Sequence, residues 1–62
     1  MNKISDKATI GKNVKIGYAT IIEDHVIIGN NVIIENHCVI KKDVSIGENT
    51  HIKNFVELRG NT

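Results

Sequence analysis

The stretch VIIGNNVIIENHCVIKKDVSIG, residues 26–47, places an isoleucine at every sixth position, with a small or β-branched residue two positions before each one. The spacing continues outward through the whole chain at ten aliphatic positions: Ile4, Ile10, Ile16, Ile22, Ile28, Ile34, Ile40, Ile46, Ile52 and Leu58. A period of six differs from the helical period of about 3.6 and from the strand period of 2. The repeat therefore excludes an amphipathic helix and a simple sandwich, and it has to be interpreted first.

Each repeat unit predicts a short strand followed by a tight corner. Because side chains alternate along a strand, Val26 and Ile28 are expected to point inward and Ile27 outward. Three units close a triangle of eighteen residues, so residues eighteen apart stack in columns, such as Ile22 on Ile40. The sequence therefore predicts an all-β fold of about three triangular coils, forming a single domain over residues 1–62.

Glycine and asparagine recur where the corners are expected. Glycines directly follow four of the isoleucines, and asparagines stand two residues later, at positions 11, 17, 29 and 47 and at 13, 31, 49 and 61. Both residue types tolerate the left-handed backbone region that tight corners use. With these corners the chain resembles the hexapeptide-repeat proteins, whose pattern is aliphatic, Gly/Ala/Glu/Asp, any, any, small, any. That resemblance implies a left-handed parallel β-helix, and the handedness follows from the resemblance alone.

Composition narrows the classes of partner. The net charge is +1 without a basic block, and the aromatic residues are Tyr18 and Phe55, so no nucleic-acid partner is expected. No apolar run is long enough to span a membrane, so no membrane partner is expected either. The single cysteine, Cys38, falls at a small inward position and is expected to be a compact filler in a reduced, cytoplasmic protein. We interpret the chain as an N-terminal piece of a longer β-helix, with a minimal oligomeric solenoid as the alternative.

Three histidines are candidates for a general base. His25 and His37 fall at corners, and His51 precedes Ile52 and is expected to point outward from a flat face. A histidine titrates near neutral pH and suits proton abstraction, so His37 and His51 are the candidate catalytic residues. Solvated surface histidines remain the alternative for each. The spacing supplies no third ligand for a zinc site, so no metal is predicted.

The stretch HIKNFVELR, residues 51–59, resembles the HxGNFVExK segment in the acetyltransferase domain of bifunctional glucosamine-1-phosphate acetyltransferase/uridyltransferases. The resemblance implies that Arg59 stands where a lysine helps to bind the sugar phosphate, and that Asn54 and Glu57 also contact substrate. Lys53 departs from the glycine of that pattern, and the catalytic histidine of that family lies downstream of it. An ordinary rung with an outward Glu57 and a corner Arg59 is the alternative.

The resemblance to hexapeptide-repeat acyltransferases implies acetyl transfer from acetyl-coenzyme A to an amino or hydroxyl group of a sugar or nucleotide sugar. In that family the sites lie between the subunits of a trimer. Two outward aliphatic residues, Ile21 and Val39, stack on one predicted face and are the expected homotrimer contact. Residues 4–58 are also similar in layout to the first coils of UDP-N-acetylglucosamine acyltransferase.

Two other interpretations remain open. Leu58-Arg59-Gly60-Asn61 is similar to the LRGD stretch of γ-carbonic anhydrase-like proteins, with Asn61 in place of the aspartate. Such a fragment would require zinc ligands that this sequence does not show. The remaining alternative is a structural or assembly β-helix module without catalysis.

Overall fold

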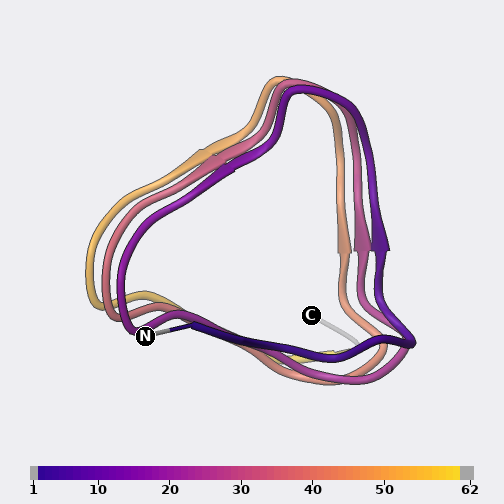
Figure 1. Cartoon of the computed structure of the whole chain (residues 1–62), viewed down its shortest axis with the longest axis horizontal. Coiled ribbons are helices and arrows are strands. Elements are labelled where there is room, and N and C mark those ends of the chain that lie inside the picture. Colours follow the sequence, from indigo (N-terminus) through magenta and orange to yellow (C-terminus); the bar gives the residue numbers. More distant parts are fainter. Residues whose placement is uncertain (1, 61–62) are drawn as a thin grey trace.

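Ten two-residue strands form a triangular coil in the computed structural model, which describes residues 2–60 (Figure 1). The strands are β1 (Lys3–Ile4), β2 (Thr9–Ile10), β3 (Lys15–Ile16), β4 (Ile21–Ile22), β5 (Ile27–Ile28), β6 (Ile33–Ile34), β7 (Val39–Ile40), β8 (Ser45–Ile46), β9 (His51–Ile52) and β10 (Glu57–Leu58). Figure 1 shows the coils stacked on one another, with the chain winding as a left-handed parallel β-helix. The predicted all-β fold of about three triangular coils is confirmed.

The three sides of the triangle are parallel sheets. One contains β1-β4-β7-β10, the second β2-β5-β8 and the third β3-β6-β9. Ile22 pairs with Ile40, and Ile28 pairs with Ile46, which is the eighteen-residue register predicted from the repeat. Along the strands, each coil donates backbone N–H groups to the next coil, as from Ile27 N to Val44 O at 2.9 Å.

The core lies on the axis of the coil. Ile22, Ile28, Ile34 and Ile40 are each at most 1% exposed, whereas the outward Ile27 is 52% exposed. The alternation predicted for Val26, Ile27 and Ile28 is therefore confirmed. Burial declines in the first coil, where Ile4 is 41% exposed and Ile10 38%. These inward side chains are less covered because only one neighbouring coil packs against them.

Small polar side chains complete the core. Thr20 is fully buried, and its Oγ1 donates to the carbonyl oxygen of Glu35 at 2.9 Å. Cys38 occupies the same place one coil later, fully buried, with its Sγ 2.8 Å from the carbonyl oxygen of Lys53. Cys38 is the compact filler that the sequence predicted, with its thiol directed at a backbone acceptor.

The corners use the left-handed backbone region at one defined position, the third residue after each inward aliphatic. Its occupants from the second corner onward are Asn13, Ala19, His25, Asn31, His37, Asp43, Asn49 and Phe55, with φ between 55° and 65°. The expectation is confirmed for Asn13, Asn31 and Asn49, whereas Asn61 lies outside the described residues. It is wrong for the glycines, since no glycine within residues 2–60 has a positive φ. At Gly11 the absence of a side chain provides space instead, because a Cβ there would lie 2.5 Å from Asn30 Oδ1.

Side-chain amides join successive coils at the corners. Asn30 Oδ1 accepts from the Lys12 backbone N–H at 2.8 Å, and Asn36 Oδ1 accepts from that of Tyr18 at 2.7 Å. Corner N–H groups lack strand partners, so these bonds satisfy donors that would otherwise depend on water. Within residues 2–60 we find no helix with the length and apolar character needed to cross a membrane.

Candidate functional site

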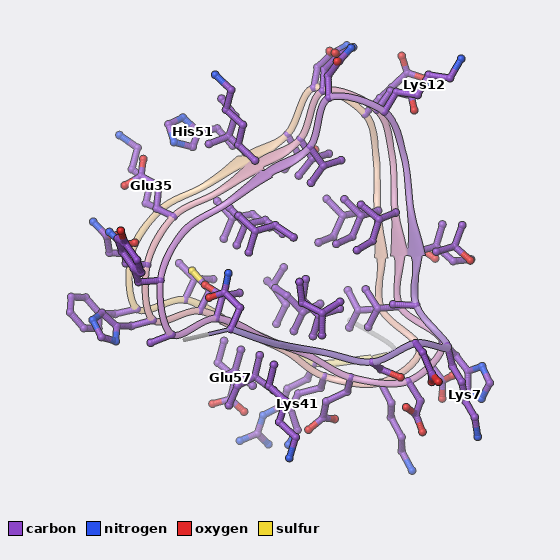
Figure 2. All side chains as sticks on the ribbon, viewed as in Figure 1. Lys7, Lys12, Glu35, Lys41, His51 and Glu57 are labelled. Carbon is purple, nitrogen blue, oxygen red and sulfur yellow. The ribbon has the colours of Figure 1, made fainter. Side chains whose placement is uncertain are left out.

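His51 lies on the outer side of β9 and contacts the carboxylate of Glu35. Ile52 is directed into the core, so strand alternation turns His51 outward. Its Nε2 contacts Glu35 Oε2 (Figure 2), and the two side chains are 46% and 31% exposed. An ionised carboxylate is only a hydrogen-bond acceptor, so Nε2 is the donor at this contact, and in the neutral imidazole Nδ1 then carries the lone pair. The pair has the geometry of a histidine base held by an acid.

Glu35 was not among the residues predicted from the sequence. It follows β6, and β6 pairs with β9 so that Ile33 lies beside His51. Glu35 is therefore two residues beyond the partner of His51, a diagonal position that a long side chain can span. The eighteen-residue register predicted this neighbourhood, but the direction of the Glu35 side chain depends on the corner that follows it.

His37 occupies a corner and does not meet His51 on the same sheet. Its φ is 59°, and its backbone N–H donates to Tyr18 O at 2.8 Å. The imidazole stacks on the ring of Phe55, with centroids 5.1 Å apart and planes within 2°. The two candidate bases therefore have different surroundings: His51 has a carboxylate partner and His37 an aromatic one.

Glu57 and Arg59 lie on a different side of the triangle from His51. Glu57 belongs to β10, in the β1-β4-β7-β10 sheet, and Arg59 Nε donates to Glu57 Oε2 at 3.1 Å. On the same side, Lys41 Nζ is 3.3 Å from Glu23 Oε2. Figure 2 shows Glu57 and Lys41 projecting together from this side, away from Glu35 and His51.

These charged side chains border a shallow depression of about 570 Å³, lined by Glu23, Lys41, Lys42, Asp43, Glu57, Arg59 and Gly60. Three cations and three carboxylates line it, so it suits a ligand that carries both signs of charge or many hydroxyl groups. Sequence reasoning identified Glu57 and Arg59 but not Glu23, Lys41 or Lys42. The register was the available signal, because positions 23, 41 and 59 form one column.

Asn54 lies at the corner between the two sides. Its Oδ1 accepts from the backbone N–H of Asn36 at 2.8 Å, as Asn36 does for Tyr18. The amide oxygen of this predicted substrate-binding residue is therefore engaged in a hydrogen bond within the fold. The structure brings Glu57 and Arg59 together and separates both from His51.

A second depression, of about 510 Å³, lies toward the first coil and includes Ser5, Ile21 and Asp24 in its lining. The Ser5 hydroxyl donates to Asp24 Oδ1 at 2.5 Å. This hydrogen bond is the main cause that lowers the pKa of Asp24; partial desolvation opposes it, and the positive charges of Lys7, His25 and Lys42 lower the pKa further. Asp24 is therefore held ionised as an acceptor, which argues against a role as a proton donor.

No group of three histidine, cysteine or carboxylate side chains within residues 2–60 is arranged to hold a metal ion. The γ-carbonic anhydrase-like interpretation requires such a group. Asn61, which carried part of that resemblance, lies outside the described residues.

The sequence also matches a known protein family. The family of bacterial transferase hexapeptide proteins (six repeats) matches this chain over residues 7–42 and again over residues 25–60. Searches of curated proteins and of solved structures found no match. The two matches overlap and together cover residues 7–60, so the chain belongs to the bacterial transferase hexapeptide-repeat family.

Proposed function

We propose that this chain is an acyltransferase-type hexapeptide-repeat protein that transfers an acetyl group from acetyl-coenzyme A to an amino or hydroxyl group of a sugar or nucleotide sugar. The observation that carries the proposal is the His51–Glu35 pair. A base held by a carboxylate on an accessible face is what proton abstraction from an acceptor requires. The family match supports a transferase of this kind and leaves donor and acceptor to this proposal.

In the proposed reaction, His51 Nδ1 removes the proton from the acceptor N–H or O–H as that atom attacks the thioester carbonyl. Glu35 holds the imidazole orientation through Nε2 and stabilises the imidazolium that forms. When the tetrahedral intermediate collapses and the C–S bond breaks, the imidazolium returns the proton to the departing thiolate. The acetyl donor supplies the activated carbonyl, and the residues of this chain move the proton.

The acceptor is proposed to lie in the depression that Glu57, Arg59 and Lys41 border. A guanidinium binds phosphate through paired N–H groups, and a carboxylate accepts from sugar hydroxyl groups. His51 and Arg59 belong to different sides of one triangular chain, so one copy does not present both to the same ligand. A homotrimer resolves this, because the β3-β6-β9 side of one subunit then faces the β1-β4-β7-β10 side of the next.

Outward aliphatic residues on both sides support this trimer. Ile21 lies on β4 and Ile33 on β6, and each is 38% exposed. Val39 stacks directly on Ile21 in the β1-β4-β7-β10 sheet. The same residues favour the second candidate, a non-catalytic assembly module. Burying Ile21, Ile33 and Val39 between subunits would stabilise an oligomer whether or not it catalyses a reaction.

We also propose a cytoplasmic location, on the basis of the buried free thiol of Cys38.

The test of catalysis is thiol release from acetyl-coenzyme A in the presence of amino-sugar phosphates. His51→Asn is expected to lower kcat by roughly 10²- to 10⁴-fold, the usual contribution of a general base. Glu35→Gln is expected to lower kcat less and to shift the pH profile. His25→Asn is the matched control, because His25 lies at another corner with a φ of 62° that asparagine adopts readily.

Three results would contradict this assignment. Equal activity in the His51→Asn variant would remove His51 as the base. A loss confined to His37→Asn would transfer the role to His37. A stable oligomer with no thiol release for any acceptor would favour the assembly module.

A further inference from the structure

Thr20 is a fully buried polar side chain at a position of the repeat that elsewhere carries valine. It lies two residues before Ile22, and the equivalent inward residues of other repeat units include Val26, Val32 and Val44. Threonine has nearly the shape of valine and differs from it by a hydroxyl group. Burying a hydroxyl group is unfavourable unless it forms a hydrogen bond, so the partner of this hydroxyl indicates its purpose.

The hydroxyl group of Thr20 bonds to the backbone of Glu35, the acid of the proposed catalytic pair. Thr20 Oγ1 donates to the carbonyl oxygen of Glu35 at 2.9 Å, whereas the carbonyl oxygen of Tyr18 lies farther away, at 3.4 Å. A hydroxyl group has one hydrogen to donate, and the shorter contact takes it. The valines at equivalent positions offer no hydroxyl group, yet the corners from the second onward all keep a φ between 55° and 65°. The turn itself therefore does not require this bond.

The backbone of Glu35 is held on both sides. The Glu35 N–H donates at 2.8 Å to the carbonyl oxygen of Ile52, the neighbour of His51 in β9. Beyond the carbonyl that Thr20 holds, the next N–H, of Asn36, donates to the side chain of Asn54 at 2.8 Å. Because the side-chain rotamers that a residue can adopt depend on its backbone angles, these bonds restrict the directions of the Glu35 side chain.

The carboxylate of Glu35 needs such a restriction. It contacts His51 Nε2, but the Glu35 side chain is 31% exposed, so water competes for the same oxygen atoms. A proton-transfer pair works only when its geometry is held closely, and the groups that hold it often lie behind it. Thr20 lies behind Glu35, on the core side of the corner, and bonds to it without contact to His51 in the hydrogen bonds of residues 2–60.

We propose that Thr20 is a positioning residue of the His51–Glu35 pair, whose buried hydroxyl group fixes the Glu35 carbonyl so that the Glu35 carboxylate faces His51. This inference rests on the acetyl transfer proposed above and adds to it a residue that acts through Glu35 alone. The first coil carries Ala8 at the equivalent position and the next corner carries Val26, so a hydroxyl group at this one place coincides with the acid of the pair.

Cys38 offers a stringent matched control. It occupies the equivalent position one coil later, is also fully buried, and its Sγ lies 2.8 Å from the carbonyl oxygen of Lys53. Cys38→Val therefore removes a contact of the same kind at the same corner, with an acceptor two residues beyond His51 and not on Glu35. General loosening of this corner would make Cys38→Val as harmful as Thr20→Val.

The first measurement needs no substrate. An NMR cross-relaxation signal between the side-chain γ protons of Glu35 and the ring protons of His51 is expected in the original chain and in Thr20→Ser, which keeps the hydroxyl group. The signal is expected to disappear in Thr20→Val. Valine occupies the equivalent position in other repeat units, so this variant is expected to fold, which circular dichroism checks. Thr20→Ala removes the same hydroxyl group with less bulk and provides a second variant.

The second measurement is thiol release from acetyl-coenzyme A with amino-sugar phosphates. Thr20→Val is expected to lower kcat by up to about 100-fold, the cost of misplacing a catalytic group, while KM changes little. Thr20→Ser is expected to retain most of the activity, and Cys38→Val is expected to leave kcat nearly unchanged. In a Glu35→Ala background, Thr20→Val is expected to have no further effect, because its action passes through Glu35.

The outcomes separate this proposal from acetyl transfer itself. A Glu35–His51 signal that persists in Thr20→Val would overturn the positioning role, as would a loss of kcat that is equal with and without Glu35 or equal in Cys38→Val. If the signal disappears in Thr20→Val while the original chain releases no thiol with any acceptor, Thr20 does position Glu35 and acetyl transfer is the part that fails.

Discussion

At the scale of single residues, the position of a residue in the repeat determines its backbone conformation. Its side chain determines which chemical group the corner exposes. Ala19, His37 and Phe55 all adopt the left-handed region at one corner, although Ala19 and Phe55 are not residue types that favour it. The surrounding coils impose the conformation through hydrogen bonds such as Phe55 N to Asn36 O. Sequence variation at this position therefore changes what the corner presents and not how the chain turns.

The Ser5–Asp24 hydrogen bond makes stability depend on pH in a definite direction. The folded pKa of Asp24 is lowered below the ordinary value of 3.8. A carboxyl group with a lowered folded pKa contributes stability above its unfolded pKa, and the contribution is lost as the pH falls through the folded pKa. Ser5→Ala is expected to lower the free energy of unfolding at pH 7, and the difference from the original chain should shrink below about pH 3.8.

Denaturant unfolding at several pH values measures this difference. Ser45→Ala is the matched control, because Ser45 is an outward hydroxyl on β8. A difference for Ser5→Ala that stayed constant from pH 7 to pH 2 would show that Asp24 titration is not its source.

At the scale of the structural element, the unit is one rung, which is a six-residue repeat made of a strand and a corner. Each corner fits closely against the next coil. The unit is too short to bury its own isoleucine, and only stacking encloses Ile22 and Ile40. Corner amides such as Asn30, and core hydroxyl groups such as that of Thr20, then satisfy the backbone groups that the strands leave. The rung is therefore stabilised by its neighbours rather than by its own contacts.

Two glycines in one column test how closely successive rungs approach. A Cβ on Gly29 would lie 2.7 Å from the backbone nitrogen of Glu48, whereas a Cβ on Gly47 would meet nothing within 4 Å. Gly29→Ala is expected to reduce the free energy of unfolding by about 1–3 kcal/mol through this overlap. Gly47→Ala is expected to raise it by about 0.4–1 kcal/mol, because alanine restricts the unfolded chain.

Thermal or denaturant unfolding of the two variants gives the comparison directly. Neither glycine has a positive φ, so a difference between them reports space and not backbone strain. Equal effects of the two substitutions would mean that the corner relaxes to accept a methyl group at position 29.

At the scale of the whole molecule, three flat sides meet at three corners, and the functional side chains are distributed among them. His51 and Glu35 lie on one side, Glu57 and Arg59 lie on another, and the corner that carries His37 and Phe55 separates the two sides. The two groups project from different sides of the triangle. The proposed homotrimer would bring the proposed base of one subunit to the proposed acceptor pocket of the next.

Replacing both Ile21 and Val39 by lysine is expected to convert the proposed homotrimer into a folded monomer. Both residues point outward from the β1-β4-β7-β10 sheet, so the core is untouched, while lysine charges would be buried at the contact between subunits. Light scattering measures the mass, and circular dichroism checks the fold. Ile27→Lys on the β2-β5-β8 sheet is the control and is expected to leave the trimer intact; an unchanged mass in the double variant would place the contact elsewhere.

The sequence by itself determined the six-residue rung, the triangular coil, the eighteen-residue columns and the outward direction of His51. It did so because hydrophobic periodicity dictates which side chains must be buried, and a period of six has few other solutions. Only the tertiary structure decided that the Glu35 side chain reaches His51 and that the His37 ring stacks on Phe55. Those contacts depend on side-chain directions at and beside the corners, and a repeat pattern carries no information about these directions.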